Sequence, residues 1–110
     1  MKLTEQKCEP CSGIGETLSP EEAGALLRDL PEWSRRGDAI ERIILCKDFA
    51  AALALINRVG AIAEQEGHHP DIFLHRYKRV RFTLSTHAVG GLTHNDFILA
   101  AKIDALFAGA

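Results

Sequence analysis

Residues 64–71 read Glu64-Gln65-Glu66-Gly67-His68-His69-Pro70-Asp71, and this stretch predicts a long helix that passes directly into a strand. Gly67 suits the left-handed conformation in which many helices end, and Pro70 keeps the residue before it out of the α region. The rings of His68 and His69 are therefore expected at the boundary between two elements. An unperturbed histidine titrates at about pH 6.5, so two imidazoles held at such a boundary suit proton transfer near neutral pH.

The helix before this junction is predicted to run from Phe49 to about Glu66, with Asp48 as its N-cap. Its apolar residues form two neighbouring stripes at helical spacing, and so wide an apolar surface is expected to pack against a sheet. The stripes are Phe49, Leu53, Ile56 and Ala63, and beside them Leu55, Val59 and Ile62. Glu64 stands one helical turn before His68, so its carboxylate could orient an imidazole or a ligand, or simply be solvated.

The residues after the junction predict a β-hairpin. Its strands are expected over residues 71–77 and 80–86, with the turn at or near Lys78 and Arg79. The second strand has one apolar face, Val80, Phe82 and Leu84, and one polar face, Arg81, Thr83, Ser85 and His87. His87 is therefore expected to leave the sheet on its polar face, as a third imidazole.

The first part of the chain predicts a short helix and another hairpin. Residues Ser19–Glu22 supply an N-cap, a proline at the first helical position and a capping box. The helix is expected to run through Leu30 and to stop at Pro31. A turn at residues 36–38 then joins two strands, of which the second covers residues 39–47.

A last helix completes the order of elements. It is expected to begin at residues 93–96, after a break at Gly90 and Gly91, and to carry apolar residues at Phe97, Leu99, Ile103 and Leu106. The order is then α-β-β-α-β-β-α. It predicts an α+β fold in which a four-stranded antiparallel sheet has helices packed on one face.

Length and composition set limits on the class of protein. The chain has 110 residues, 46% hydrophobic and 25% charged, which suits one globular domain and is too short for two cores. We expect this domain over residues 18–110, after a leader of residues 1–17. A formal net charge of −2 gives no bulk attraction to nucleic acid or to an anionic membrane. The sequence shows no apolar run of about 20 residues and no signal-peptide hydrophobic region, so we expect a cytoplasmic protein.

The leader carries Cys8 and Cys11 in a CxxC spacing. A structural zinc site needs two further ligands, and a thioredoxin-type redox pair needs a preceding strand. Neither lies nearby, so we favour reduced cysteines without a metal or redox role and keep those two roles as alternatives. Cys46 is expected to be buried in its strand.

Taken together, these motifs resemble the pterin-4a-carbinolamine dehydratase family, in its bacterial branch. The resemblance runs from about Leu18 to Ile103, and the CxxC leader is similar to that of bacterial members. The residues that carry it are Trp33, Arg42, Asp48-Phe49, Glu64, His68-His69-Pro70-Asp71, Tyr77, Val80, Leu84-Ser85-Thr86-His87, Gly91-Leu92-Thr93 and Asp96. One position departs from the family: many members carry Asp or Asn directly before the histidine pair, where this chain has Gly67.

The resemblance implies an enzyme, a 4a-hydroxytetrahydrobiopterin dehydratase. It would remove water from a 4a-hydroxytetrahydropterin to give quinonoid dihydropterin, without a metal or a tightly bound cofactor. Expelling the 4a-hydroxyl needs a proton donor, and the N5 proton needs an acceptor. By resemblance, His68 and His87 share the acid and base roles in an order left open, and His69 holds the pterin and assists. The expected substrate-binding residues are Glu64, Gly67, Ser85, Thr86 and Asp96.

The resemblance also implies assembly into a homodimer or homotetramer and a functional link to an aromatic amino-acid hydroxylase. The predicted sheet gives a physical reason for self-association, because one face and the edges are left uncovered. We expect no nucleic-acid partner and no membrane partner.

Three alternatives stay open. Asp96 stands three residues after Thr93, so it fits the acidic position of a capping box as well as a binding site. The histidines could bind zinc, although the chain lacks the HxxxH or HExxH spacing of many catalytic zinc sites. The fold could instead serve as a protein-interaction, dimerisation or assembly module, for which a basic cluster at the second hairpin is the candidate surface: Arg76, Lys78, Arg79 and Arg81.

Overall fold

The computed structural model describes residues 2–9 and 17–108 of the chain. In this part, the order of helices and strands is the predicted α-β-β-α-β-β-α, and no helix is long and apolar enough to cross a bilayer. The elements are η1 (Leu3–Glu5), α1 (Pro20–Leu27), β1 (Ser34–Arg36), β2 (Ala39–Leu45), α2 (Phe49–Glu66), β3 (Asp71–His75), β4 (Arg79–Leu84), η3 (His87–Val89) and α3 (His94–Ala108), where η marks a 3₁₀ turn.

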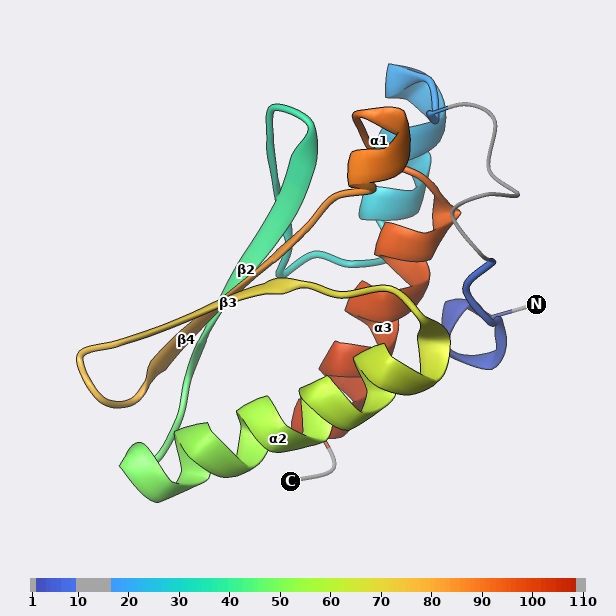
Figure 1. Ribbon diagram of the computed structural model, residues 1–110. Helices are drawn as coiled ribbons and strands as arrows, with labels where there is room; N and C mark the ends of the chain where they lie inside the picture. Colours follow the sequence, from blue (N-terminus) through green and yellow to red (C-terminus); the bar gives the residue numbers. More distant parts are fainter. Residues whose placement is uncertain (1, 10–16, 109–110) are drawn as a thin grey trace.

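The strands form one antiparallel sheet in the order β1-β2-β4-β3. Its register places Ile40 opposite Leu84 and Ile44 opposite Val80, so the apolar side chains of β2 and β4 meet on one face. The helices α1, α2 and α3 lie on that side of the sheet, and no described helix covers the other side (Figure 1). The predicted α+β fold is confirmed.

The core lies between the sheet and the helices. Val80, Phe82 and Leu84 of β4 are fully buried, as their alternation predicts. The helix α3 runs through the middle of the molecule, with α2 and η1 packed against it (Figure 1). Because neighbours surround α3, its residues from Asn95 to Ala101 are all buried. The polar side chains of its first turn therefore need hydrogen-bond partners inside the protein.

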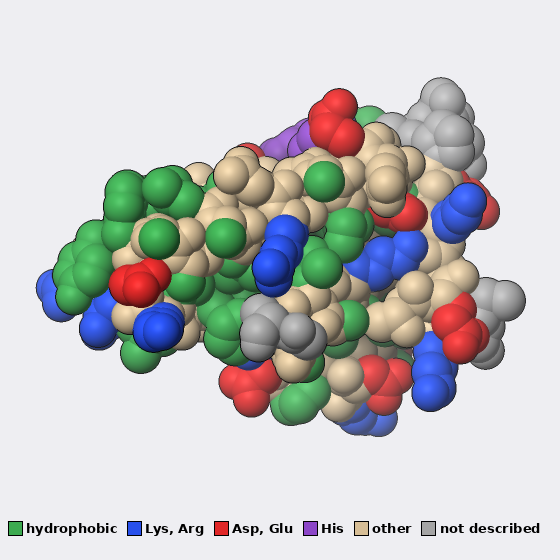
Figure 2. Space-filling view, turned by 90° about the horizontal axis from the view of Figure 1, so that it is seen from below, with side chains coloured by type: hydrophobic (Ala, Val, Ile, Leu, Met, Phe, Trp, Pro, Cys, Tyr) green, Lys and Arg blue, Asp and Glu red, His purple; other side chains and the backbone are tan. Residues whose placement is uncertain are grey.

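The helix α2 has its predicted bounds because both ends are capped. Asp48 accepts the N–H of Ala51 at 2.8 Å, and Gly67 adopts a left-handed φ of 65°. The prediction that both apolar stripes are buried is wrong, since Phe49 and Leu53 are exposed. They lie where α2 extends past α3, and hydrophobic side chains gather at that end of the molecule in Figure 2. The buried face consists of Ala52, Leu55, Val59 and Ala63.

The helix α1 ends earlier than predicted. Its capping box of Ser19 and Glu22 is confirmed, but the last helical residue is Leu27 rather than Leu30. The reason is Pro31, whose ring would clash with the carbonyl of Leu27 if the helix continued.

The second hairpin turns two residues earlier than predicted. The strand β3 ends at His75 rather than Tyr77, because Arg76 and Tyr77 adopt positive φ angles of 48° and 54° and form the turn with Lys78. Tight turns of this kind usually carry Gly, Asn or Asp, and neither Arg76 nor Tyr77 is one of these residues, so no local signal predicts a turn at this place.

Candidate functional site

A small pocket opens where the end of α2 meets the residues after β4. It has a volume of about 170 Å³, and its lining consists of Gly67, His68, His69, Ser85, His87 and Ala88. Five of the eight predicted site residues are in this lining. The other three join it through side-chain bonds, from Glu64 to His69, from Asp96 to His68 and from Thr86 to Asp96. The structure thus brings all eight into one connected region.

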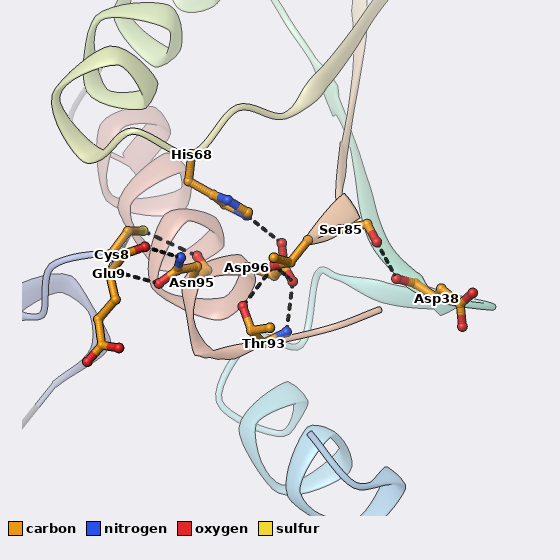
Figure 3. A network of polar contacts seen from close by, with 9 residues as sticks. Cys8, Glu9, Asp38, His68, Ser85, Thr93, Asn95 and Asp96 are labelled. Carbon is orange, nitrogen blue, oxygen red and sulfur yellow. Dashed lines mark hydrogen bonds and ion pairs between the residues drawn. The ribbon is translucent and has the colours of Figure 1, made fainter. Parts of the chain in front are cut away.

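His68 is the buried imidazole of this region. The left-handed cap at Gly67 ends the helical path, and the next residue turns inward until the side chain of His68 is only 4% exposed. Its Nε2 lies 2.6 Å from Oδ1 of Asp96, in the first turn of α3 (Figure 3). Two elements separated by 28 residues therefore meet through this contact.

Asp96 is fully buried, and both of its carboxylate oxygens are used. Oδ2 accepts the hydroxyl of Thr86 and the backbone N–H of Thr93, each at 2.9 Å. A carboxylate oxygen accepts a hydrogen bond, so we assign the hydrogen of the contact with His68 to Nε2. The bond from Thr93 is also the capping contact that the alternative interpretation predicted. Asp96 therefore caps α3 and holds His68 at the same time.

Thr93 belongs to this network, although the sequence did not single it out as a site residue. Its hydroxyl lies 2.8 Å from that of Thr86, so each threonine supports the other beside Asp96. The available signal was its place at the N-cap, three residues before the acidic residue.

His69 and Glu64 form a second, exposed pair. Nε2 of His69 lies 2.6 Å from Oε1 of Glu64, and the side chains are 61% and 78% exposed. The carboxylate thus orients an imidazole, but that of His69 and not that of His68, because the chain leaves the helix at Gly67. Such an exposed pair contributes about 0 to 1 kcal/mol to stability, so its role in holding the fold is small.

The residues after β4 reach the pocket by a turn instead of a continued strand. The prediction that the strand reaches residue 86 and that His87 leaves the sheet on its polar face is wrong, because β4 ends at Leu84 and His87 is the exposed first residue of η3. An isolated bridge between Thr86 and Gly91 closes this loop and directs Thr86 into the interior. Ser85 donates its hydroxyl to the carbonyl oxygen of Asp38 at 2.7 Å, which ties the pocket to the β1–β2 turn (Figure 3).

The sequence analysis also left open a redox or metal-binding role for the cysteines and a zinc site formed by the histidines. Burial, and next to it the charge of Glu66, raises the pKa of the Cys8 thiol to about 12, so this thiol is protonated at neutral pH. Cys11 lies outside the described residues, and the CxxC prediction stays untested. Cys46 is buried, as predicted, but it lies one residue past the end of β2 rather than within the strand. Within residues 2–9 and 17–108, no group of three or more His, Cys, Asp and Glu side chains is placed to hold a metal ion.

Comparison with known proteins identifies the family. The sequence model described as pterin 4 alpha carbinolamine dehydratase matches residues 16–106. The chain belongs to this family. Its relatives include a protein of Nocardia farcinica, 52% identical over 91 residues that cover 83% of this chain and 95% of the relative. A protein of Halorhodospira halophila is 46% identical over 109 residues, 96% of this chain and 98% of the relative. Both are provisionally named pterin-4-alpha-carbinolamine dehydratase.

A solved structure of the family has the same fold. The protein is a transcriptional coactivator/pterin dehydratase from Brucella melitensis, 34% identical to this chain, with a TM-score of 0.78. The match covers 83% of this chain and 98% of that protein. The family resemblance predicted from the histidine motifs is confirmed.

Proposed function

We propose that this member of the family is a hydro-lyase that removes water from a 4a-hydroxytetrahydropterin and releases quinonoid dihydropterin. The names of its relatives support a pterin-4-alpha-carbinolamine dehydratase. The observation that carries the proposal is the pocket lined by His68, His69 and His87, in which the first of these is backed by the buried Asp96. Dehydration changes no oxidation state overall, so the site needs a proton donor, a proton acceptor and groups that hold the ring.

His68 fits the role of the base. Its Nε2–H is engaged by Asp96, and its Nδ1 makes no hydrogen bond to any residue that the structure describes. This nitrogen is therefore available to take the N5 proton of the substrate as the C4a–N5 double bond forms. Asp96 then stabilises the imidazolium that results, as the carboxylate of a hydrolase triad does for its histidine.

His87 fits the role of the acid. It lines the pocket from η3, opposite the end of α2, and its side chain is exposed to solvent, from which a lost proton can be replaced. A proton given to the 4a-oxygen lets the hydroxyl leave as water, while the electrons of the N5–H bond form the new double bond. One proton is taken up and one released, so the reaction balances.

The other site residues hold the substrate or support the base. We assign His69, oriented by Glu64, to the pterin ring, and Gly67 to the pocket wall. The hydroxyl hydrogen of Ser85 is engaged by Asp38, so this oxygen is left to accept an N–H of the ligand. Thr86 and Asp96 are buried behind His68, and we assign them to holding that ring.

The test is the dehydration of a 4a-hydroxytetrahydropterin generated in solution. The purified protein, treated with a chelator, should remove the carbinolamine well above the spontaneous rate. A rate that stays at the spontaneous level would contradict the proposal. A rate that chelation abolishes and added zinc restores would favour the zinc alternative instead.

We also propose that the protein acts as a homodimer or homotetramer in the cytoplasm, on substrate supplied by an aromatic amino-acid hydroxylase. Self-association is supported by the uncovered face of the sheet, on which Ile43, Leu45 and Phe73 are exposed. The division into a leader of residues 1–17 and a domain of residues 18–110 remains a prediction.

The alternative is a protein-interaction or assembly module. The Brucella melitensis relative carries both descriptions, coactivator and dehydratase. In the basic cluster of this chain, Lys78 lies over the ring of Tyr77 at 5.6 Å and Arg81 over that of Phe73 at 5.0 Å. Replacing Arg76 and Arg79 by serine should leave the dehydration rate unchanged, and a loss of activity would show that this cluster serves the enzyme and not a partner.

A further inference from the structure

The backbone of Cys8 and Glu9 makes hydrogen bonds to the end of α2, which leads into His68, and to the start of α3, which carries Asp96. The N–H of Cys8 donates to Oε1 of Glu66, the last residue of α2, at 2.7 Å. The N–H of Glu9 donates to Oδ1 of Asn95 at 2.9 Å, and the Nδ2 of Asn95 donates to the carbonyl oxygen of Glu9 at 2.8 Å. One amide side chain thus satisfies both backbone groups of Glu9, as a neighbouring strand would.

The residues that make these contacts are close neighbours, along the chain, of the proposed base and its carboxylate. Asn95 precedes Asp96 in the first turn of α3, and Glu66 stands two residues before His68. In Figure 3, Cys8 and Glu9 lie on one side of this turn and His68 on the other. The N-terminal residues therefore connect the two elements whose separation sets the contact between His68 and Asp96.

Glu66 strengthens this connection. Burial by itself raises the pKa of its carboxyl, but the hydrogen bonds from Cys8 and Lys102 and the charge of Lys102 outweigh it and hold the pKa below the ordinary value. Its Oε2 accepts the ammonium of Lys102 at 3.0 Å, on α3. The end of α2 is thus joined to α3 directly by the ion pair and also through Cys8 and Glu9.

Helix formation alone does not explain the contacts. The helix α3 has its N-terminal cap from Thr93 and Asp96, and α2 has its C-terminal cap at Gly67, without any help from the N-terminal residues. Asn95 is 2% exposed and could be apolar if it served packing only. Its two hydrogen bonds to Glu9 fix the position of the first turn of α3 relative to the end of α2.

We propose that Asn95 is a positioning residue of the dehydratase site: by binding the backbone of Glu9, it holds Asp96 where its carboxylate receives Nε2 of His68. The effect on turnover rests on the proposed function, whereas the effect on the geometry of His68 does not. A misplacement of about 1 Å at a distance from the chemistry can cost about 100-fold in rate, so loosening this turn reduces kcat and leaves KM close to its original value.

The experiment compares Asn95→Ala with Leu3→Ala in the full chain. Leu3 packs against the core from η1, so its truncation weakens the same N-terminal segment at a point away from the site. In Asn95→Ala, kcat should fall about tenfold or more with KM changed less than about twofold, while Leu3→Ala keeps the kcat of the original protein. If the two variants lose the same stability and the same activity, the role of Asn95 is only structural and the proposal is overturned.

A second readout needs neither substrate nor activity. The ring N–H of His68, buried against Asp96, should give a slowly exchanging downfield proton resonance in the original protein and in Leu3→Ala, and a broadened or absent one in Asn95→Ala. If the original protein shows no dehydratase activity but Asn95→Ala still loses the resonance, the positioning role is supported and only the proposed function is contradicted. A resonance kept in Asn95→Ala overturns the positioning role.

The original protein offers a check in case Asn95→Ala does not fold. The amide hydrogens of Cys8 and Glu9 should exchange with solvent as slowly as those of the first part of α3, because they belong to the same bonded unit. Exchange of both amides at the rate of a free chain would contradict the proposal.

Discussion

At the scale of single residues, Asp96 determines whether His68 can act as a base. Asp96→Asn keeps the shape and an acceptor for the N–H of Thr93, but it turns an amide NH₂ toward Nε2 of His68. The ring hydrogen must then move to Nδ1, which removes the free base. We expect kcat to fall about 10²- to 10⁴-fold with little change in melting temperature. Steady-state kinetics and thermal unfolding check this. An unchanged kcat would show that Asp96 only caps α3.

Gly67, directly before the histidine pair, has a backbone that limits its replacements. Its φ is 65°, and an added Cβ would meet no further heavy atom within 4 Å. Asn tolerates this conformation, whereas Ala in it costs about 1 kcal/mol. We expect Gly67→Ala to lower the free energy of unfolding by that amount, and Gly67→Asn to lower it less and to reduce KM by adding a polar group to the pocket. Denaturant unfolding measures the two stabilities and steady-state kinetics measures KM. Equal destabilisation by Gly67→Ala and Gly67→Asn would contradict the prediction.

Local signals predicted the junction at residues 67–70 well, since a glycine and a proline restrict the backbone whatever surrounds them. The eight site residues followed from the family motif, and the structure places them in one region. The hydrogen-bond partners of His68 and His69 could not be predicted from the sequence. Glu64 reaches His69 because the chain leaves the helix at Gly67, and His68 reaches a carboxylate 28 residues away because α2 packs on α3.

At the scale of elements, α2 shows what periodicity can predict. Its bounds follow from its caps, which are local, but its buried face follows from its neighbours. Ala52 is fully buried, although it belongs to neither predicted stripe, while the larger Phe49 and Leu53 are exposed. The spacing of large apolar residues does not show where a small residue faces a close neighbour. The turn at Arg76 and Tyr77 was missed for a similar reason, because neither residue has turn propensity of its own.

The contact between the end of α2 and α3 should make stability depend on pH through Glu66. Its pKa in the folded protein lies below the ordinary 4.5, so its contribution is present above that value and is lost as the pH falls through the folded pKa. At pH 7, Glu66→Gln should lower the free energy of unfolding by about 1 to 2 kcal/mol, because a charged acceptor of Lys102 and Cys8 is lost. Urea unfolding between pH 2.5 and 7 checks this, and a difference that grows toward low pH would contradict it.

At the scale of the whole molecule, the helices cover one face of the sheet and leave the other to solvent (Figure 1). Arg81 lies opposite both Ile43 and Phe73, so an exposed apolar side chain flanks it on each side of the uncovered face. Exposed apolar surface and free strand edges favour self-association. Light scattering at micromolar concentration should therefore show a dimer or tetramer.

The same surface provides the control. Ile43→Ser with Phe73→Ser should shift the population toward monomer if this face is the contact, whereas Tyr77→Ser, at the exposed hairpin turn, should leave the assembly unchanged. A monomer in the original protein would contradict self-association, and an unchanged oligomer in the double variant would place the contact on another surface.

The central claim is that His68 and His87 form one acid–base unit, and a double-mutant cycle tests it most directly. His68→Ala and His87→Ala should each lower kcat about 10²- to 10⁴-fold. The double variant should be barely worse than the poorer single variant, because residues that act as one unit lose little more when the second is removed. His69→Ala should mainly raise KM, and His94→Ala, at the exposed start of α3, should match the original protein. Full activity of the folded double variant, measured without added metal and against the spontaneous rate, would contradict the account.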